Sequence, residues 1–251
     1  MLPMPRATQT RLPAEGPARV RRGYFDCRYG QLHVHNAMPP GGGFEEGAPL
    51  LCVHDLTGSG RTFAPFLALA GQDRSVYAPD LPGFGESDGP TRAPAIADYA
   101  AALGDFLDSM RLHPITVLGL RGGALLAAEL AILRPTQVSR VIMVSVPLLT
   151  ETERTARIQA AAPAASDGAC RPAQWLRWAH EAAARYPLGE RLPKLTQRLL
   201  VLRPRDDLWE ATARVREALP ATRFTDLEKP AIELFACAPQ RVSEAVREFL
   251  R

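Results

Sequence analysis

Short apolar runs alternate along the chain with segments in which apolar residues recur at the spacing of an α-helix. Near-continuous apolar runs are typical of strands that are buried on both faces of a parallel sheet. Such runs occupy residues 51–57, 75–80, 115–120, 141–146 and 198–204, with a weaker one at 223–227. Residues 23–37 alternate between apolar and polar positions on either side of Tyr29-Gly30, which predicts a β-hairpin.

Helical periodicity fills most of the intervals between these strands. The predicted helices cover residues 62–71, 95–110, 123–135, 207–219 and 239–250. In the last of them Val242, Val246 and Phe249 fall on one face, and Pro239 lies near the first turn. The repeated order of strand and helix predicts an α/β protein with an open, doubly wound sheet.

One long segment departs from this rhythm. Residues 147–197 are rich in alanine, interrupted by proline and without a strand pattern, so we expect a short helical insertion over the carboxyl edge of the sheet. The insertion divides the α/β core into residues 20–146 and 198–251. Its Trp175 and Trp178 are three positions apart on one helical face, where they either seat the insertion on the core or line an apolar pocket.

The net charge of +3 is concentrated at the start of the chain, because residues 1–22 hold five arginines and one glutamate. Residues 1–19 are expected to form a disordered, basic, proline-rich tail, and the rest of the chain is near neutral. Without a basic face interleaved with aromatic residues, no nucleic-acid partner is expected. No run approaches the roughly 18 apolar residues that span a bilayer, so no transmembrane segment is expected either.

The four cysteines are scattered and show none of the paired spacing that zinc sites use. Reduced thiols packed as small apolar residues are typical of cytoplasmic proteins, and that is the expected compartment. We expect no metal and no cofactor, and the sequence sets no oligomeric state.

From about residue 20 onward the chain resembles proteins of the α/β-hydrolase fold. Four stretches carry the resemblance in the family's order: "LLCVHDLTGSG", similar to the H-G-x-x-G loop after the third strand, "VYAPDLPGFGESDGP", "VSRVIMVSVP" and "LVLRPRDDLWEAT". The resemblance implies a mostly parallel eight-stranded sheet flanked by helices, with a short helical cap. It also implies that Asp80 ties down the loop that follows the fourth strand.

The stretch "VLGLRGGALLAAELA" corresponds to the family's nucleophile elbow, a strained turn between strand and helix that carries serine in G-x-S-x-G. Arg121 stands at the serine position here, between Gly119 and Gly123. A guanidinium is permanently protonated and cannot attack an acyl group. The resemblance therefore implies the elbow's geometry without its nucleophile.

The base of the triad is also missing by this comparison. The family places its histidine after the acid, but no histidine follows residue 180, and by spacing Ile232 takes that position. The acid alone remains, as Asp207 or its neighbour Asp206. The triad is therefore expected to be degenerate, and hydrolysis by a Ser-His-Asp mechanism is not expected.

The same turn predicts an anion site. Amides at Asp55, Leu56 and Gly122 correspond to the family's oxyanion hole, and a helix N-terminus attracts anions. Arg121 adds a planar fork that suits a carboxylate or phosphate. With His54 nearby, these five residues form the expected site for a small anionic or carbonyl-containing ligand.

Alternative interpretations of these residues remain open. In one interpretation, His54 activates Cys52 or Ser59, which then acts as the nucleophile from a position outside the elbow. In the other, His54 has a structural role and holds its loop through hydrogen bonds. An internal pair between Arg121 and Asp207 would satisfy both charges and plug the pocket.

Three functions follow from these alternatives. The first is a non-hydrolytic pseudoenzyme that binds a small anionic ligand. The second is an enzyme of another class that uses Asp207, such as a cofactor-independent lyase, cyclase or isomerase, or an atypical esterase. The third is a protein-interaction role with a vestigial pocket. A cavity of about 300 Å³ or more favours the first two, and a closed contact between Arg121 and Asp207 favours the third.

Overall fold

The computed structural model describes residues 18–39, 47–160 and 173–251. Most of the expected tail, residues 1–17, lies outside the described residues. Ala18 does not belong to a disordered tail: it is buried, and its N–H donates to the carbonyl of Ala68, 2.8 Å away in helix α1 (Ala64–Ala70). The chain is therefore packed against the core two residues before the predicted boundary.

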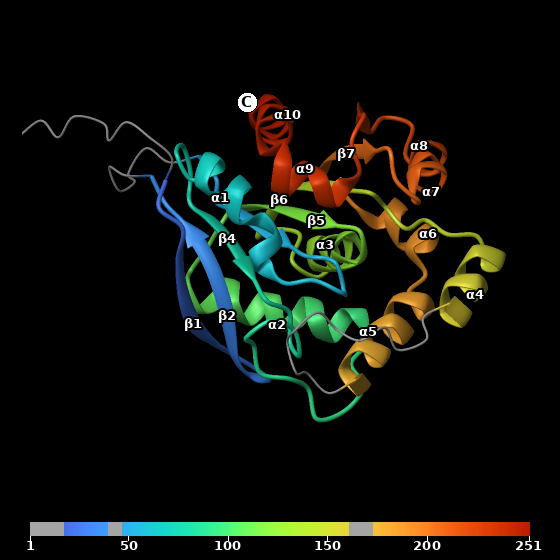
Figure 1. The fold of residues 1–251 in the computed structure, drawn as a ribbon, viewed down its shortest axis with the longest axis horizontal. Coiled ribbons are helices and arrows are strands. Elements are labelled where there is room, and N and C mark those ends of the chain that lie inside the picture. The colour runs from blue at the N-terminus through green and yellow to red at the C-terminus, as the bar shows by residue number, and fades with distance from the viewer. Residues whose placement is uncertain (1–17, 40–46, 161–172) are drawn as a thin grey trace, which may run out of the picture.

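The sheet has eight strands in the order β1-β2-β4-β3-β5-β6-β7-β8 (Figure 1). They are β1 (Arg21–Cys27), β2 (Gly30–Ala37), β3 (Leu50–Val53), β4 (Val76–Pro79), β5 (Ile115–Leu120), β6 (Val138–Val144), β7 (Arg198–Pro204) and β8 (Arg223–Leu227). Strand β2 runs antiparallel to both of its neighbours, and all other pairs are parallel. The predicted hairpin and the predicted mostly parallel eight-stranded sheet are confirmed.

Helices cover both faces of the sheet (Figure 1). Helices α2 (Ile96–Ser109) and α3 (Gly122–Leu133) pack on one face, and α1, α9 (Ala231–Cys237) and α10 (Pro239–Leu250) pack on the other. Each face buries its own apolar cluster, as expected for strands that are apolar on both sides. In the described part of the chain, no helix is long and apolar enough to cross a membrane.

The sequence pattern missed or merged some short helices. Helix α9 begins where the pattern indicated a loop, and the predicted helix over 207–219 is divided into α7 (Trp209–Ala213) and α8 (Val215–Ala218). The predicted helix over 62–71 begins as a 3-10 turn, η1 (Gly60–Phe63).

The segment between β6 and β7 contains helices α4 (Glu151–Ala160), α5 (Ala173–Arg185) and α6 (Leu188–Arg191), followed by η2 (Leu192–Lys194). They lie beyond one end of the sheet (Figure 1), and no described residue of this segment belongs to a strand. Trp175 of α5 donates its indole N–H to the carbonyl of Pro90, 3.0 Å away. A Cβ on Gly89 would collide with the Trp175 ring, so the glycine lets the ring rest directly on the loop after β4. Trp175 thus seats the insertion on the core, as predicted.

The carboxyl ends of β3, β5, β6 and β7 meet at a single edge, because these strands are parallel and in register. Asp55, Arg121 and Asp207 follow the ends of β3, β5 and β7 within a few residues. The sheet topology therefore brings together side chains that are far apart in the sequence.

Candidate functional site

Arg121 occupies a strained turn between β5 and α3, with φ 52° and ψ −113°. Its N–H donates to the carbonyl of Val144, 2.8 Å away, which ties the turn to the neighbouring strand. A Cβ on Gly119 would collide with the Gly123 carbonyl, and a Cβ on Gly123 would collide with the carbonyls of Val53 and His54. The two glycines therefore allow the strand and the helix to pack at this angle, with Arg121 projecting from the turn.

The Arg121 guanidinium lies among three carboxylates. Its Nη1 and Nη2 donate to the two oxygens of Asp207 at 2.7 and 3.1 Å, and its Nε donates to Asp55 Oδ2 at 3.3 Å. Asp206 Oδ2 lies 3.5 Å from Nη1. Burial opposes the charged form, but the hydrogen bond to Asp207 and the nearby carboxylates outweigh it and raise the pKa of Arg121. Arg121 is therefore charged and fully partnered.

Asp55 fills the expected oxyanion hole from within the protein. Its Oδ1 accepts hydrogen bonds from the amides of Leu56, at 2.8 Å, and Gly122, at 2.9 Å. A Cβ on Gly122 would lie 2.8 Å from that oxygen, so the glycine makes room for the carboxylate. The sequence prediction located the amides but missed their occupant. The signal was an aspartate directly after His54, where the H-G-x-x-G pattern has glycine.

The two neighbouring aspartates at the end of β7 have different partners. Asp207 is held by Arg121 and by Arg157 of α4, and the hydrogen bonds from Arg121 are the largest cause that lowers its pKa to about 2. Asp206 accepts from Ser145 Oγ at 2.7 Å and from the Leu208 amide at 3.0 Å. Asp207 therefore faces the cationic side chains, while Asp206 also anchors its own loop.

His54 does not belong to the ligand site, contrary to the prediction. It is completely buried; its Nδ1 lies 2.7 Å from the Asp55 carbonyl, and its Nε2 accepts from the Leu81 amide at 2.9 Å. Burial also lowers its pKa, so the ring is a neutral organiser of the loop. Neither ring nitrogen is free to activate Cys52 or Ser59. Burial within β3 raises the pKa of the Cys52 thiol as well, so neither rearranged nucleophile is supported.

Ile232 does not lie where a catalytic base would act. Its side chain is 65% exposed in the first turn of α9, and it does not line the cavity described below. The spacing argument assumed a loop that continues after β8, but Pro230 begins a helix there.

A cavity of about 580 Å³ opens over Arg121 and Asp55. Its apolar wall comes from both the core and the insertion: Leu125, Pro147, Leu148, Leu149 and Leu208. Its polar wall includes Arg154 and Arg157 of α4. A sizeable cavity and a closed contact between Arg121 and Asp207 therefore exist together, although the sequence analysis treated them as alternatives.

His180 of α5 is the one histidine among the described residues that line this cavity. Burial lowers its pKa, and the charge of Asp55 opposes that shift only in part. The ring is therefore neutral at pH 7. Sequence reasoning missed it because the insertion that carries it shows no motif.

Residues 48–229 match the family model described as "alpha/beta hydrolase fold". The chain belongs to the α/β-hydrolase fold family. Solved structures similar to this α/β-hydrolase include a thermophilic esterase from Thermogutta terrifontis with malate bound, at 18% identity over 92% of this chain and 98% of that one, with a TM-score of 0.75. An enol-lactonase from Burkholderia xenovorans has the same TM-score at 17% identity, over 91% and 99% of the two chains. At such identities the likeness shows the fold alone.

The α/β-hydrolase also matches uncharacterized proteins of Mycobacterium tuberculosis and Mycobacterium bovis. They are 32% identical over 99 residues, which is 39% of this chain and 29% of theirs. The match thus spans less than a third of the length of these curated relatives.

Proposed function

We propose that this α/β-hydrolase-fold protein is a non-hydrolytic family member, a pseudoenzyme, that binds a small carboxylate-bearing molecule in the cavity beside Arg121. The observation that carries the proposal is that two of the protein's own side chains occupy the positions at the elbow where a nucleophile and a substrate oxyanion would lie. Arg121 stands at the nucleophile position, and the Asp55 carboxylate accepts both of the amides that would stabilise an oxyanion.

Hydrolysis by the family mechanism needs a nucleophile, a base and free oxyanion donors. Arg121 supplies no nucleophile, and both nitrogens of the nearest loop histidine, His54, are engaged. An anionic intermediate would also have to displace the like-charged Asp55 from its two donors. His180 lines the cavity, but no serine or cysteine is among the described residues that line it. A nucleophile and free oxyanion donors are therefore both missing.

Ligand binding draws on the rest of the cavity. Arg157 is already paired with Asp207. Among the described residues, the Arg154 side chain forms an ion pair only with Glu151, at 3.6 Å, and the Glu151 side chain is 82% exposed. An exposed pair of this kind contributes about 0–1 kcal/mol, so Arg154 is the cavity cation that a ligand carboxylate can take over most readily. The leucine-rich wall suits a short apolar body. The similar Thermogutta terrifontis esterase, solved with malate, is a family member with a dicarboxylate bound.

The alternative that Asp207 acts as a general base has less support. A carboxyl whose pKa is lowered to about 2 by hydrogen bonds from Arg121 holds a proton weakly and is a poor base at neutral pH. The protein-interaction alternative makes the cavity vestigial, so it predicts no small-molecule binding.

The test is a calorimetric and thermal-shift comparison of short mono- and dicarboxylates with their neutral amides. We expect the carboxylates alone to bind and to raise the melting temperature. Arg154→Gln should weaken that binding about tenfold, which corresponds to one charge-assisted hydrogen bond. Arg177→Gln is the matched control, because Arg177 lies on α5 with a 68% exposed side chain and does not line the cavity.

Two outcomes would overturn the proposal. One is the absence of binding by every carboxylate, or equal binding by the Arg154 variant. The other is turnover of short p-nitrophenyl esters above background by the wild-type protein, abolished by a single serine or cysteine substitution. We expect Arg121→Ser to remain inactive, because the Asp55 carboxylate still occupies the amides that would stabilise an oxyanion.

A further inference from the structure

A second group of buried polar side chains lies at the other side of the sheet, on β2 and at the end of β4. His33, His35 and Asp80 are only 2%, 5% and 1% exposed. One ligand atom from each of the three lies within 4.8 Å of the others. None of them lines the cavity over Arg121, so this group is separate from the site described above.

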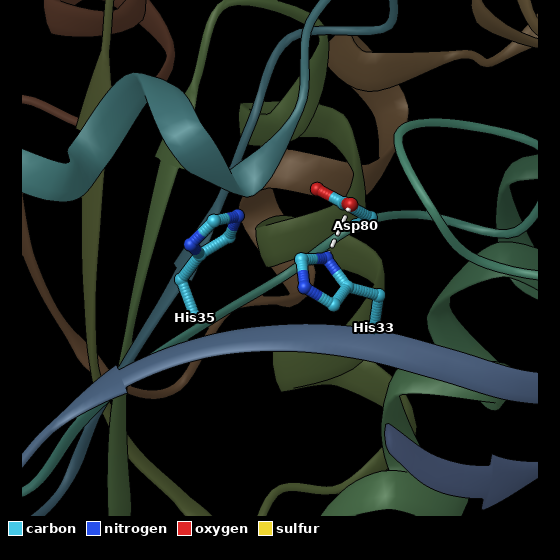
Figure 2. A group of neighbouring side chains, drawn as sticks. All are labelled: His33, His35 and Asp80. Carbon is cyan, nitrogen blue, oxygen red and sulfur yellow. Dashed lines mark hydrogen bonds and ion pairs between the residues drawn. The ribbon is translucent and has the colours of Figure 1, made fainter. Parts of the chain in front are cut away.

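Strand pairing brings the three side chains together. His33 and His35 are two positions apart on β2 and therefore project from the same face of the strand. The Asp80 amide donates to the His33 carbonyl at 2.8 Å, which places the aspartate beside this histidine. Figure 2 shows both imidazoles rising from β2 toward Asp80.

We propose that His33, His35 and Asp80 form a binding site for a divalent transition-metal ion, of which Zn²⁺ is the probe. Two imidazoles and one carboxylate are a donor set that Zn²⁺ takes in proteins, with water completing the coordination. Imidazole donors also favour Zn²⁺ over Mg²⁺ and Ca²⁺, which prefer oxygen ligands alone.

The hydrogen bonds of the group leave ligand capacity unused. Asp80 Oδ2 accepts from His33 Nδ1 and from the Glu86 amide, both at 2.9 Å, while Oδ1 accepts from the Gly60 amide, at 2.6 Å. A carboxylate offers about four lone-pair positions, so Oδ1 keeps one for a metal. The buried ring of His35 makes no hydrogen bond to any described residue and lies edge-on to His33, with ring centroids 4.7 Å apart. A buried imidazole that makes no hydrogen bond to a described residue, and that lies beside a carboxylate and a second imidazole, is the observation that points to a ligand.

The geometry needs only small movements. Three atoms no more than 4.8 Å apart have a centre within about 2.8 Å of each, so shifts below about 1 Å reach zinc bonds of roughly 2.0–2.2 Å. For His33 Nδ1 to bind the metal, the single ring proton would move to Nε2. The resulting Nε2–H would point toward Glu86 Oε2, which lies 4.0 Å away and accepts from the Tyr24 hydroxyl at 2.9 Å. A carboxylate that accepts from the second ring nitrogen is the usual support of a metal-bound histidine.

The test is titration of chelator-treated full-length protein with Zn²⁺ by calorimetry, with Mg²⁺ in parallel. The background is the double variant Cys170→Ser/Cys237→Ser, which removes the exposed thiol of the described residues and the cysteine that lies outside them as competing ligands. We expect one Zn²⁺ per chain, a rise in melting temperature and no response to Mg²⁺. His35→Gln should weaken Zn²⁺ binding at least tenfold and abolish the rise.

His35 is the residue to change, because His33 and Asp80 also hold the loop after β4. His180→Gln is the matched control, since it removes a half-buried histidine from the separate cavity and should leave the affinity unchanged. With Co²⁺ in place of Zn²⁺, the visible absorption bands of a nitrogen- and oxygen-ligated ion should appear in the control and be lost in the His35 variant. Absence of binding, or equal binding by the His35 variant, would overturn the proposal.

Discussion

At the scale of single residues, the elbow is governed by charge balance. A cation at the start of a helix is unfavourable by about 0.3–1 kcal/mol, and a desolvated cation needs an anion. Arg121 lies at the start of α3 with a side chain that is only 16% exposed, and Asp55, Asp206 and Asp207 surround it. Arg157 adds a second cation from α4. This network links the insertion to the core, because Asp207 pairs with Arg157 of α4 and with Arg121 of the elbow, so that the opposite charges compensate each other.

The pairing of Asp207 predicts a specific dependence of stability on pH. Hydrogen bonds from Arg121 lower the pKa of Asp207 to about 2, whereas an unfolded aspartate titrates near about 3.9. A lowered folded-state pKa contributes stability above about pH 4, and that contribution is lost as the pH falls from about 4 to about 2. Asp207→Asn should therefore be less stable at pH 7, and the difference from wild type should shrink below pH 4. Urea unfolding of both proteins between pH 2 and 7 measures this difference in the free energy of unfolding. A difference that stays constant over this pH range would contradict the prediction.

At the scale of elements, close approach between β3, β5 and α3 shapes the elbow. The glycines on both sides of Arg121 leave room for backbone against backbone, and no side chain can move away to admit a methyl group. We therefore expect the turn to accept a different side chain at position 121 more readily than a larger residue at Gly119 or Gly123. The centre carries arginine with positive φ, and the glycine flanks are kept.

Gly123→Ala should test this argument directly. Its Cβ would collide with the carbonyl oxygen of Val53, so we expect a loss of about 1–3 kcal/mol in the free energy of unfolding. Gly189→Ala is the control, because its Cβ would lie 3.7 Å from Leu148 Cδ1, an ordinary contact inside the short helix α6. That control should be neutral or stabilising, since alanine is the better helix former. Equal losses in the two variants, measured by chemical denaturation, would refute the packing argument.

The pattern of apolar positions predicted elements with unequal success. It located the first two strands from their alternation around a turn, and the other six as short apolar runs bounded by polar turns. Helix α9 was missed because it has only seven residues and its stability comes from packing. Phe235 meets Phe63 and Phe66 edge-on, with ring centroids 4.8 and 5.5 Å apart. A helix held by such long-range contacts leaves little local signal.

At the scale of the whole molecule, the sheet separates two apolar clusters, and the insertion is attached at one end by polar contacts and by apolar residues that join one of these clusters. Arg214 makes two hydrogen bonds to Glu153 of α4, and Arg191 of α6 makes three to the buried Glu129 of α3. Trp175 adds a direct contact with the loop after β4. These polar contacts add to apolar packing, because Ala179, Leu188 and Leu192 of the insertion are buried in the cluster that also holds residues of α2 and α3.

Trp175→Ala should loosen helix α5 more than the central strands, because Trp175 rests on the loop after β4. We expect hydrogen exchange in α5 to become about ten times faster or more, because the indole contact and its hydrogen bond to Pro90 are lost, while exchange in β5 and β6 stays close to wild type. Arg177→Ala, at an exposed position of the same helix, should change little. If α5 and the central strands accelerate together, the insertion is not an independent unit.

The sequence alone determined the fold class, the position of the elbow, the arginine at its centre and the lack of any histidine after residue 180. These follow from local periodicity and residue identity, which do not depend on distant partners. Tertiary structure alone decided that Asp55 fills the amides, that Arg121 pairs across 86 positions with Asp207, and that His33, His35 and Asp80 converge. Such contacts depend on strand register and side-chain direction, which arise only when the sheet has formed and its packing has fixed them.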